Sequence, residues 1–407
     1  TAYEVAARLS HFAALSSPDA ELSALAASGE ILMRPQLLAQ LHRLWQLPAG
    51  RAARRLQILQ WLGLSTPLRR DDLDAELSAD MDAQLASLID DVLENQDASL
   101  TKLLTSRRQL VSNALAEHYG LPVPAEESVD LADLSPTPYA GALSTGPFLS
   151  RYRGPSERGL RIREALLCQP LSPHPPGDYP LGAGATPRER ITAAVAGKTG
   201  CAPCHQLVDP LGFALEAFDD QGSLTGFDTT GAFQSLVTSA TTPLSGPLDL
   251  GTQIAQSQEG LSCAARRYLE YALDTSLPVT TEARIALSGP SNPADDWTNC
   301  LSLVLNTNKG SLAAMSESIV SSVLMLTRAD PARYVVAFDT SVDPLEHAYQ
   351  ETLQFRQVFP TSAEELVISA YAEALRQASQ GLEAGGDGGA AGAGGASTGT
   401  AGHAGAP

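Results

Sequence analysis

Two cysteines and a histidine stand together in the pentapeptide Cys201-Ala-Pro-Cys204-His205. On one helical turn, two thiols at this spacing reach the same edge of a flat porphyrin and can add to its two vinyl groups. The next residue is then held under the iron. With 5 Cys and 7 His in 407 residues, chance would produce this pattern about 0.001 times per chain. We therefore predict one covalently bound haem c, with Cys201 and Cys204 as tethers and His205 as an axial ligand.

Three other uses of a Cys-x-x-Cys pair stay open, namely a thiol-redox site, half of a zinc site and an inert structural pair. A zinc site needs a further close pair of Cys or His residues, and Cys168, Cys263 and Cys300 do not have that spacing. A thiol-redox site is typical of a βαβ frame, which the surrounding pattern does not indicate. The sequence favours haem over all three.

The residues after the motif predict part of a haem pocket. Pro210 and Gly212 are expected to end the haem-bearing helix in a turn, so that Phe213 and Phe218 can pack against the porphyrin. A turn followed by an ordinary amphipathic helix explains the same residues. Several arginines before the motif could pair with haem propionates, with solvated helix faces as the other explanation: Arg158, Arg161, Arg163, Arg188 and Arg190.

The sixth ligand of the iron stays open. Met315 and Met325 are the thioether candidates, although both occupy apolar positions of expected helices and core packing explains them too. His174, in a Pro-rich stretch before the motif, is the best imidazole candidate. A filled sixth position favours electron transfer, whereas an open one favours peroxide or oxygen chemistry.

The other three cysteines predict one disulfide. Cys263 and Cys300 are 37 residues apart, and in an oxidising compartment their disulfide would contribute about 3–4 kcal/mol. Two buried thiols are the alternative. Cys168 is then left over, and we expect it to be buried as a small apolar side chain.

Apolar residues recur at helical spacing through most of the chain, which predicts a mainly α fold. A helical bundle or array is expected over residues 1–122, with one of its helices running from about Ser99 to His118. A loop-rich haem domain with short helices and closing helices follows over 123–328. Residues 329–384 form a helical extension of open role, and the Gly- and Ala-rich segment 385–407 is a flexible tail or linker.

Charge and hydropathy exclude two classes of protein. The net charge of −19 opposes binding to the nucleic-acid phosphate backbone. It could steer a basic redox partner, or it could serve solubility alone. No run approaches the roughly 18 apolar residues of a membrane span. The chain opens inside a helical pattern without a signal peptide, so we expect a processed or truncated chain.

Five stretches resemble a family of planctomycete-type and myxobacterial-type secreted, helical, cytochrome-c-like proteins with tandem domains of unknown function. The resemblance extends over roughly residues 1–328, and its most specific string is CxxCH-x₃-DPLGF-x₂-E-x-FD. The matching stretches are Tyr3–Leu25, Asn113–Pro122, Arg158–Gln169, Cys201–Gly222 and Cys263–Asp274. It implies an exported protein with haem at Cys201, Cys204 and His205, and it carries no settled activity.

The sequence therefore predicts an exported c-type cytochrome for electron transfer, in the periplasm, on the cell surface or secreted. It works with redox protein partners, or as the haem-bearing part of a larger redox assembly. The first alternative is a haem enzyme of peroxidase or oxygenase type with an open sixth position. The second is a structural cell-surface or assembly protein in which haem or cysteines mainly stabilise the fold.

Overall fold

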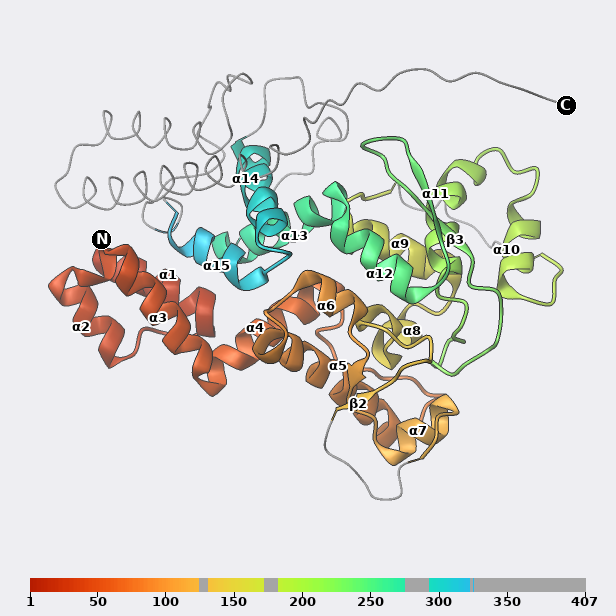
Figure 1. The fold of residues 1–407 in the computed structure, drawn as a ribbon, viewed down its shortest axis with the longest axis horizontal. Coiled ribbons are helices and arrows are strands. Elements are labelled where there is room, and N and C mark those ends of the chain that lie inside the picture. The colour runs from red at the N-terminus through yellow and green to blue at the C-terminus, as the bar shows by residue number, and fades with distance from the viewer. Residues whose placement is uncertain (124–130, 172–181, 275–292, 323–324, 326–407) are drawn as a thin grey trace, which may run out of the picture. The chain divides into compact units, whose positions relative to one another are not determined.

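A computed structural model describes residues 1–123, 131–171, 182–274, 293–322 and 325 (Figure 1). The contacts between Cα atoms divide the chain into two units, Thr1–Phe338 and Asp339–Pro407, and every described residue belongs to the first unit. This part of the chain is mainly helical, as predicted. The expected extension over 329–384 and the tail over 385–407 lie outside the described residues.

Helices α1 to α5 occupy the first 95 residues. They are α1 (Ala2–Ala14), α2 (Ala20–Ser28), α3 (Arg34–Gln46), α4 (Pro48–Leu62) and α5 (Ala75–Asn95), with the 3-10 turn η1 (Glu30–Leu32) before α3. Local chemistry fixes their ends: Asp19 caps α2 by accepting from the Leu22 N–H at 3.0 Å, Pro48 opens α4, and Gly63 ends α4 in the left-handed region.

The single helix expected from Ser99 to His118 is wrong, because two helices separated by a strand occupy these residues. Helix α6 (Leu100–Thr105) precedes β1 (Arg108–Gln109), which pairs antiparallel with β2 (Ala132–Asp133), and α7 (Asn113–Tyr119) follows. Ser112 starts the new helix, since its Oγ accepts from the Leu115 N–H at 3.1 Å. A local cap thus interrupts a stretch whose apolar spacing continues.

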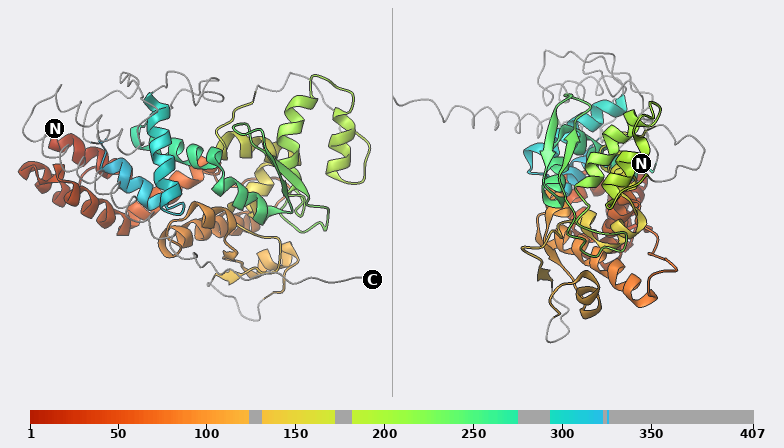
Figure 2. Two further views of the ribbon diagram at one scale, coloured as in Figure 1. Left: turned by 45° about the horizontal axis from the view of Figure 1, so that its top comes forward. Right: turned by 90° about the vertical axis from the view of Figure 1, so that its right-hand side faces the viewer.

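The second half alternates short helices with loops, as the sequence indicates. Figure 2 shows a hairpin of β3 (Gly231–Gln234) and β4 (Thr241–Leu244) between the helices that precede and follow it. Gly231 pairs with Leu244 and Gln234 with Thr241 in this antiparallel ladder. The helices are α8 (Gly146–Arg151) after the turn η2 (Ala142–Ser144), α9 (Pro155–Leu166), α10 (Pro187–Val195), α11 (Ala202–Phe213), α12 (Pro247–Gln256), α13 (Gln258–Leu273), α14 (Pro293–Thr307) and α15 (Leu312–Val320).

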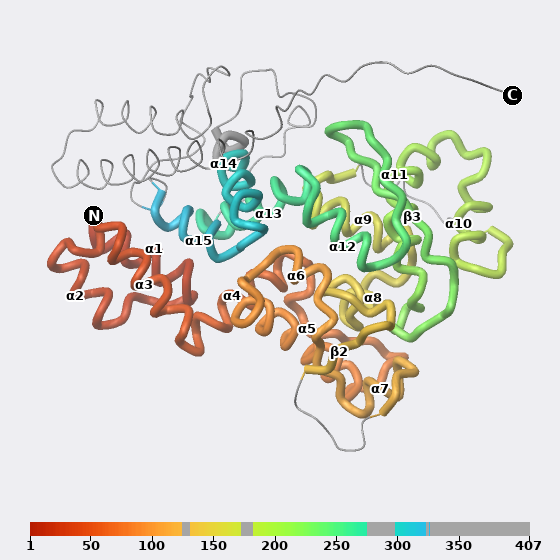
Figure 3. Tube along the Cα trace, viewed as in Figure 1, coloured from red at the N-terminus to blue at the C-terminus, as the bar shows by residue number. Residues whose placement is uncertain are grey.

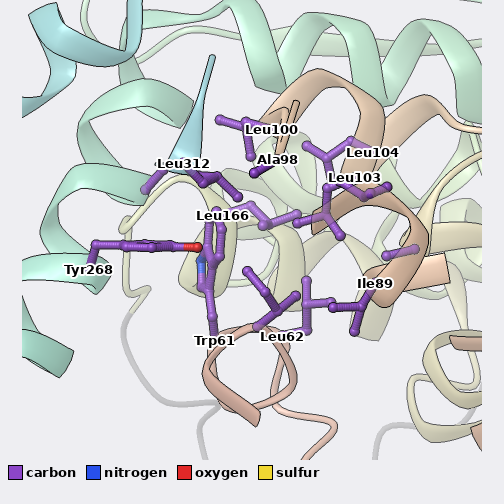
Figure 4. Packing of buried hydrophobic residues seen from close by; sticks show 14 of the residues in the cluster. Trp61, Leu62, Ile89, Ala98, Leu100, Leu103, Leu104, Leu166, Tyr268 and Leu312 are labelled. Atoms are coloured by element: carbon purple, nitrogen blue, oxygen red, sulfur yellow. The ribbon is translucent and has the colours of Figure 1, made fainter. Parts of the chain in front are cut away.

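One hydrophobic core joins both halves of the first unit. The chain path brings α12 of the second half against α6 of the first (Figure 3). In Figure 4, Trp61 of α4 and Tyr268 of α13 point toward each other, and their ring centroids lie 6.3 Å apart. The Trp61 indole N–H also donates to the Ala165 carbonyl at 2.7 Å. The boundary expected at residue 122 therefore falls inside a single packed unit.

The expected disulfide between Cys263 and Cys300 is wrong, and so is the buried thiol expected at Cys168. Cys168 follows α9 and is bonded to Cys263 of α13, with Cα atoms 5.2 Å apart. Cys300 lies on α14. Sequence separation favoured the nearer partner, but the packing of α9 against α13 brings together two residues 95 positions apart.

Candidate functional site

The cysteine motif forms the first turn of α11, as predicted. Cys201 is the N-cap residue, and Cys204 and His205 follow within the first turn. All three side chains are half-buried, whereas Pro203 and Gln206 beside them are exposed. The two thiols and the imidazole are therefore partly accessible, on a helix that packs against α9, α10 and β3.

Helix α11 continues past the point where it was expected to end. Pro210 stands inside the helix, although it lacks the N–H that would bond to the carbonyl four residues back. The close packing of α9 on α11 accompanies this continuation. A Cβ on Gly212 would lie 1.8 Å from the Pro155 carbonyl oxygen, and a Cβ on Gly159 would lie 1.8 Å from the Val208 carbonyl oxygen. Only glycine allows the two backbones to approach this closely.

Two arginines of α9 hold the far end of α11 and the loop after it. Arg163 Nε donates to the Leu207 carbonyl at 3.1 Å, and Arg158 Nη1 donates to the carbonyls of Leu215 and Phe218, both at 3.0 Å. Burial lowers the pKa of each guanidinium to about 10, so both stay charged at neutral pH. Arg158 and Arg163 were expected either to pair with haem propionates or to lie on solvated helix faces. Both expectations are wrong, because both side chains are buried and donate to backbone carbonyls.

Helix α10 is anchored at its start. Thr186 and Glu189 form a capping box, and Arg188 pairs with the buried Glu216 carboxylate at 2.8 Å. The Arg188 guanidinium lies 4.4 Å from the centroid of the Phe213 ring. Phe213 therefore lies where α10 meets the C-terminal end of α11, at the opposite end of that helix from the motif.

Phe218 is placed differently from the expectation. Its side chain is buried, and its ring centroid lies 4.8 Å from that of Tyr139, which in turn packs against Tyr119. A ring enclosed by these protein side chains has no face left for a porphyrin. The expected role of Phe218 as a pocket wall is therefore wrong, and the residue belongs to the core behind α11.

His205 is oriented by the carboxylate of Asp209, which lies four residues later on α11. The imidazole Nδ1 lies 2.9 Å from Asp209 Oδ2 and 3.1 Å from Oδ1. Asp209 is buried, and its Oδ1 also accepts from Ser156 Oγ of α9 at 2.6 Å. Because the Asp209 carboxylate accepts a hydrogen bond from Nδ1–H, Nε2 is the nitrogen through which this ring would coordinate an iron.

The spacing of four residues between His205 and Asp209 was a usable signal, because it puts both side chains on one face of a helix. Ser156 gave no such signal, since it comes from another helix.

Burial, with the Asp209 and Cys201 side chains as lesser causes, raises the pKa of the Cys204 thiol. Activated redox thiols have the opposite shift.

The structure brings none of the candidate sixth ligands that it describes to the motif. Met315 and Met325 are buried in the core, and α15 packs mainly against α3, α13 and α14, whereas α11 packs against α9, α10 and β3. Figures 1 and 2 show α15 and α11 apart. His174 lies outside the described residues. In the described ranges, no group of three or more His, Cys, Asp or Glu side chains could hold a metal ion.

Two family models match the chain. PSD4, described as a protein of unknown function (DUF1592), matches residues 1–121. PSCyt3, also described as a protein of unknown function (DUF1588), matches residues 140–228, which include the cysteine motif and the α9–α11 packing. No curated protein and no solved structure gives a match. The two models confirm the resemblance drawn from the sequence.

Proposed function

We propose that this chain, which belongs to the family of proteins that carry the PSD4 and PSCyt3 domains, is a monohaem c-type cytochrome that transfers electrons. One observation carries the proposal. Cys201, Cys204 and His205 occupy a half-exposed helical turn in which the buried Asp209 holds Nδ1 of the imidazole. The name of the PSCyt3 model also hints at an association with cytochromes.

The donor set fits haem c. When bound, haem c supplies an iron that accepts and releases one electron. Cys201 and Cys204 would provide the two thioether sulfurs, and His205 would hold the iron through Nε2. Asp209 fixes the ring plane and the tautomer of His205, and Ser156 fixes the Asp209 carboxylate. Each of these side chains comes from α9 or α11, whose packing is close and glycine-mediated.

Asp209→Asn should raise the reduction potential of the iron. A carboxylate that accepts from Nδ1–H gives the imidazole partial imidazolate character, which stabilises the ferric state. A neutral amide in the same place gives less of this character. If the substitution weakens the stabilisation of the ferric state over the ferrous state tenfold, the reduction potential rises by about 60 mV. Spectroelectrochemical titration of the full chain measures this shift.

The matched control for that variant is Asp71→Asn, which removes one exposed carboxylate elsewhere and controls for the change in net charge. A potential that moves equally in both variants would contradict the role of Asp209. Ser156→Ala should move the potential in the same direction by less, because it loosens the carboxylate without removing it.

Location and partners follow from charge and cysteine chemistry. Disulfides persist in oxidising compartments, and the Cys168–Cys263 disulfide supports an extracytoplasmic location in the periplasm, on the cell surface or outside the cell. Among the described residues, no helix combines the length and apolar character that crossing a bilayer requires.

The net charge of −19 suits a basic redox partner or a larger redox assembly, whose association should weaken as salt rises.

The second candidate is a haem enzyme of peroxidase or oxygenase type, and the same Asp209 contact favours it, because an electron-rich axial ligand also stabilises higher oxidation states. Absorption and electron paramagnetic resonance spectra separate the two. Electron transfer predicts a low-spin iron in both oxidation states. A high-spin ferric iron that binds cyanide at once and reacts rapidly with peroxide would identify the enzyme instead.

A further inference from the structure

Exposed apolar side chains gather at the base of the hairpin of β3 and β4, in the part of the chain that follows the cysteine motif. Nine large hydrophobic side chains are exposed in the described ranges, and four of them lie within residues 224–248. Val237 belongs to the turn that joins the two strands. The other three lie at or beyond the open end of the hairpin: Leu224 (41% exposed), Phe227 (39%) and Leu248 (39%). Exposed apolar side chains that gather in one place are typical of surfaces that bind another protein.

Hydrogen bonding holds together the two segments that carry Phe227 and Leu248. The antiparallel ladder closes where β3 begins and β4 ends. Just beyond it, Thr229 Oγ1 donates to the Ser245 carbonyl at 3.4 Å. Phe227 comes two residues before Thr229, and Leu248 comes three residues after Ser245. The two exposed apolar side chains therefore belong to adjoining segments.

Each of these segments also carries an exposed carboxylate directly after its apolar residue, namely Asp228 and Asp249. Hydrogen bonds from the Thr230 N–H and hydroxyl lower the pKa of Asp228, which keeps this carboxylate ionised at neutral pH. Asp228 pairs with Arg188 at 3.2 Å. Because Arg188 also pairs with the buried Glu216 at 2.8 Å, one negative charge stays uncompensated among these three groups.

The segment that forms this part of the molecule contains no basic residue. Residues 199–265 have seven Asp and Glu residues and no Lys or Arg. Asp209, Glu216 and Glu259 are buried, and the other four acids are at least partly exposed. A surface with carboxylates around apolar side chains attracts a partner that carries positive charge and opposes one that carries negative charge.

We propose that the base of the hairpin is the docking surface for a basic redox protein that exchanges one electron with this chain. The hairpin-base surface consists of Leu224, Phe227, Asp228, Leu248 and Asp249. Its apolar side chains exclude water at the centre of the contact, and its two carboxylates pair with Lys or Arg side chains of the partner. The inference rests on the proposed function, since the exchanged electron leaves or enters the haem.

The hairpin-base surface is joined to the helix that carries the motif. Arg188 Nη2 donates to the Asp228 carbonyl at 3.0 Å, and the Arg188 guanidinium lies 4.4 Å from the centroid of the Phe213 ring. Phe213 comes nine residues after Cys204, which is about 14 Å along an α-helix. A partner on this surface therefore lies beside the far end of α11, at a distance of the order over which single electrons cross proteins.

Isothermal titration of the full chain with mitochondrial cytochrome c, a strongly basic redox protein, tests the proposal at low salt. Saturable binding is expected. Asp228→Asn/Asp249→Asn should weaken it about tenfold, because two charges that meet basic side chains are lost. Asn keeps an oxygen that can accept from the Thr230 and Ser245 N–H groups, so the loops should keep their structure. Phe227→Ser should weaken binding about tenfold as well, because it removes the central apolar contact.

Glu30→Gln/Asp97→Asn is the matched control for the charge variant, since it removes two exposed carboxylates outside the hairpin-base surface. Tyr3→Ser is the control for Phe227→Ser, because Tyr3 is 60% exposed. Each control should change the affinity at most about twofold, since charges more than a Debye length from a contact are largely screened. Circular dichroism checks that all four variants keep the wild-type helix content.

The proposal is overturned if mitochondrial cytochrome c does not bind saturably, or if the control pair weakens binding as much as Asp228→Asn/Asp249→Asn does. Unchanged affinity in Phe227→Ser would overturn it too, because attraction to net charge alone needs no apolar centre. Cys201→Ala/Cys204→Ala, which should carry no haem, separates this inference from the proposed function. It should bind with wild-type affinity, since the hairpin-base surface includes no residue of the motif. A wild-type chain that binds the partner but carries no haem would refute the proposed function and the electron exchange, and would leave only the docking surface.

Discussion

A Cys201→Ala/Cys204→Ala variant, produced with a cytochrome c maturation system, is expected to carry no covalently bound haem. The two sulfurs are the only atoms of the motif that can form thioether bonds to the porphyrin, so their removal eliminates the attachment completely. The fold should persist, because α11 is held by the glycine contacts with α9 and by Arg163 rather than by the thiols. Haem staining after denaturing electrophoresis measures the loss, and circular dichroism measures the retained helix content.

Cys300→Ala is the matched control for this variant, since it removes a thiol on α14 and should leave haem attachment unchanged. Covalent haem in the double variant would show that other residues form the bonds. A His205→Ala variant adds a second readout. It should keep at least part of the covalent attachment but lose the native axial ligand, and an unchanged spectrum would contradict the assignment of His205.

Cys263→Ala should reduce the free energy of unfolding by about 4 kcal/mol. The Cys168–Cys263 disulfide closes a loop of 95 residues, and in the loop-entropy model a loop of this length contributes about 4–5 kcal/mol. This loop includes α10, α11, the hairpin and α12, so the disulfide restrains the whole segment that carries the cysteine motif. Chemical denaturation followed by circular dichroism measures the change.

Cys168→Ala should have nearly the same effect, and the double variant should be little less stable than either single variant, because both substitutions break one bond. Cys300→Ala should cost far less. Peptide mapping without reduction should recover residues 168 and 263 in one linked species. A linked species of residues 263 and 300 would restore the pairing that sequence spacing suggested and contradict the structure.

Features that depend on local chemistry were predictable. The capping box of Thr186 and Glu189 and the position of the cysteine motif on a helical turn follow from caps, prolines and spacing. Each of these signals acts within one or two turns of the backbone, and the sequence displays it directly.

Features that depend on packing between distant segments were not predictable from the sequence. Arg158 and Arg163 look like solvated helix residues, and only the approach of α9 to α11 reveals that they bond to backbone carbonyls. The same close packing accompanies the continuation of α11 through Pro210. Helix packing, and not sequence distance, likewise selects Cys168 as the partner of Cys263. The expectation for Phe218 was wrong because its position after a turn does not show which side chains will cover its ring.

The candidate site shows the same division. The tethers and the axial ligand could be predicted from five consecutive residues, and Asp209 could have been found from its spacing. Ser156 could not, because it comes from another helix and lies far from Asp209 in the chain.

The central claim is that Cys201, Cys204 and His205 hold one haem c. A pyridine haemochrome spectrum combined with the intact mass of the full chain, after expression with a cytochrome c maturation system, tests it most directly. The account predicts a spectrum typical of haem with two thioether bonds, and a mass increased by one haem that survives denaturation. A colourless protein with the mass of the bare polypeptide would contradict it.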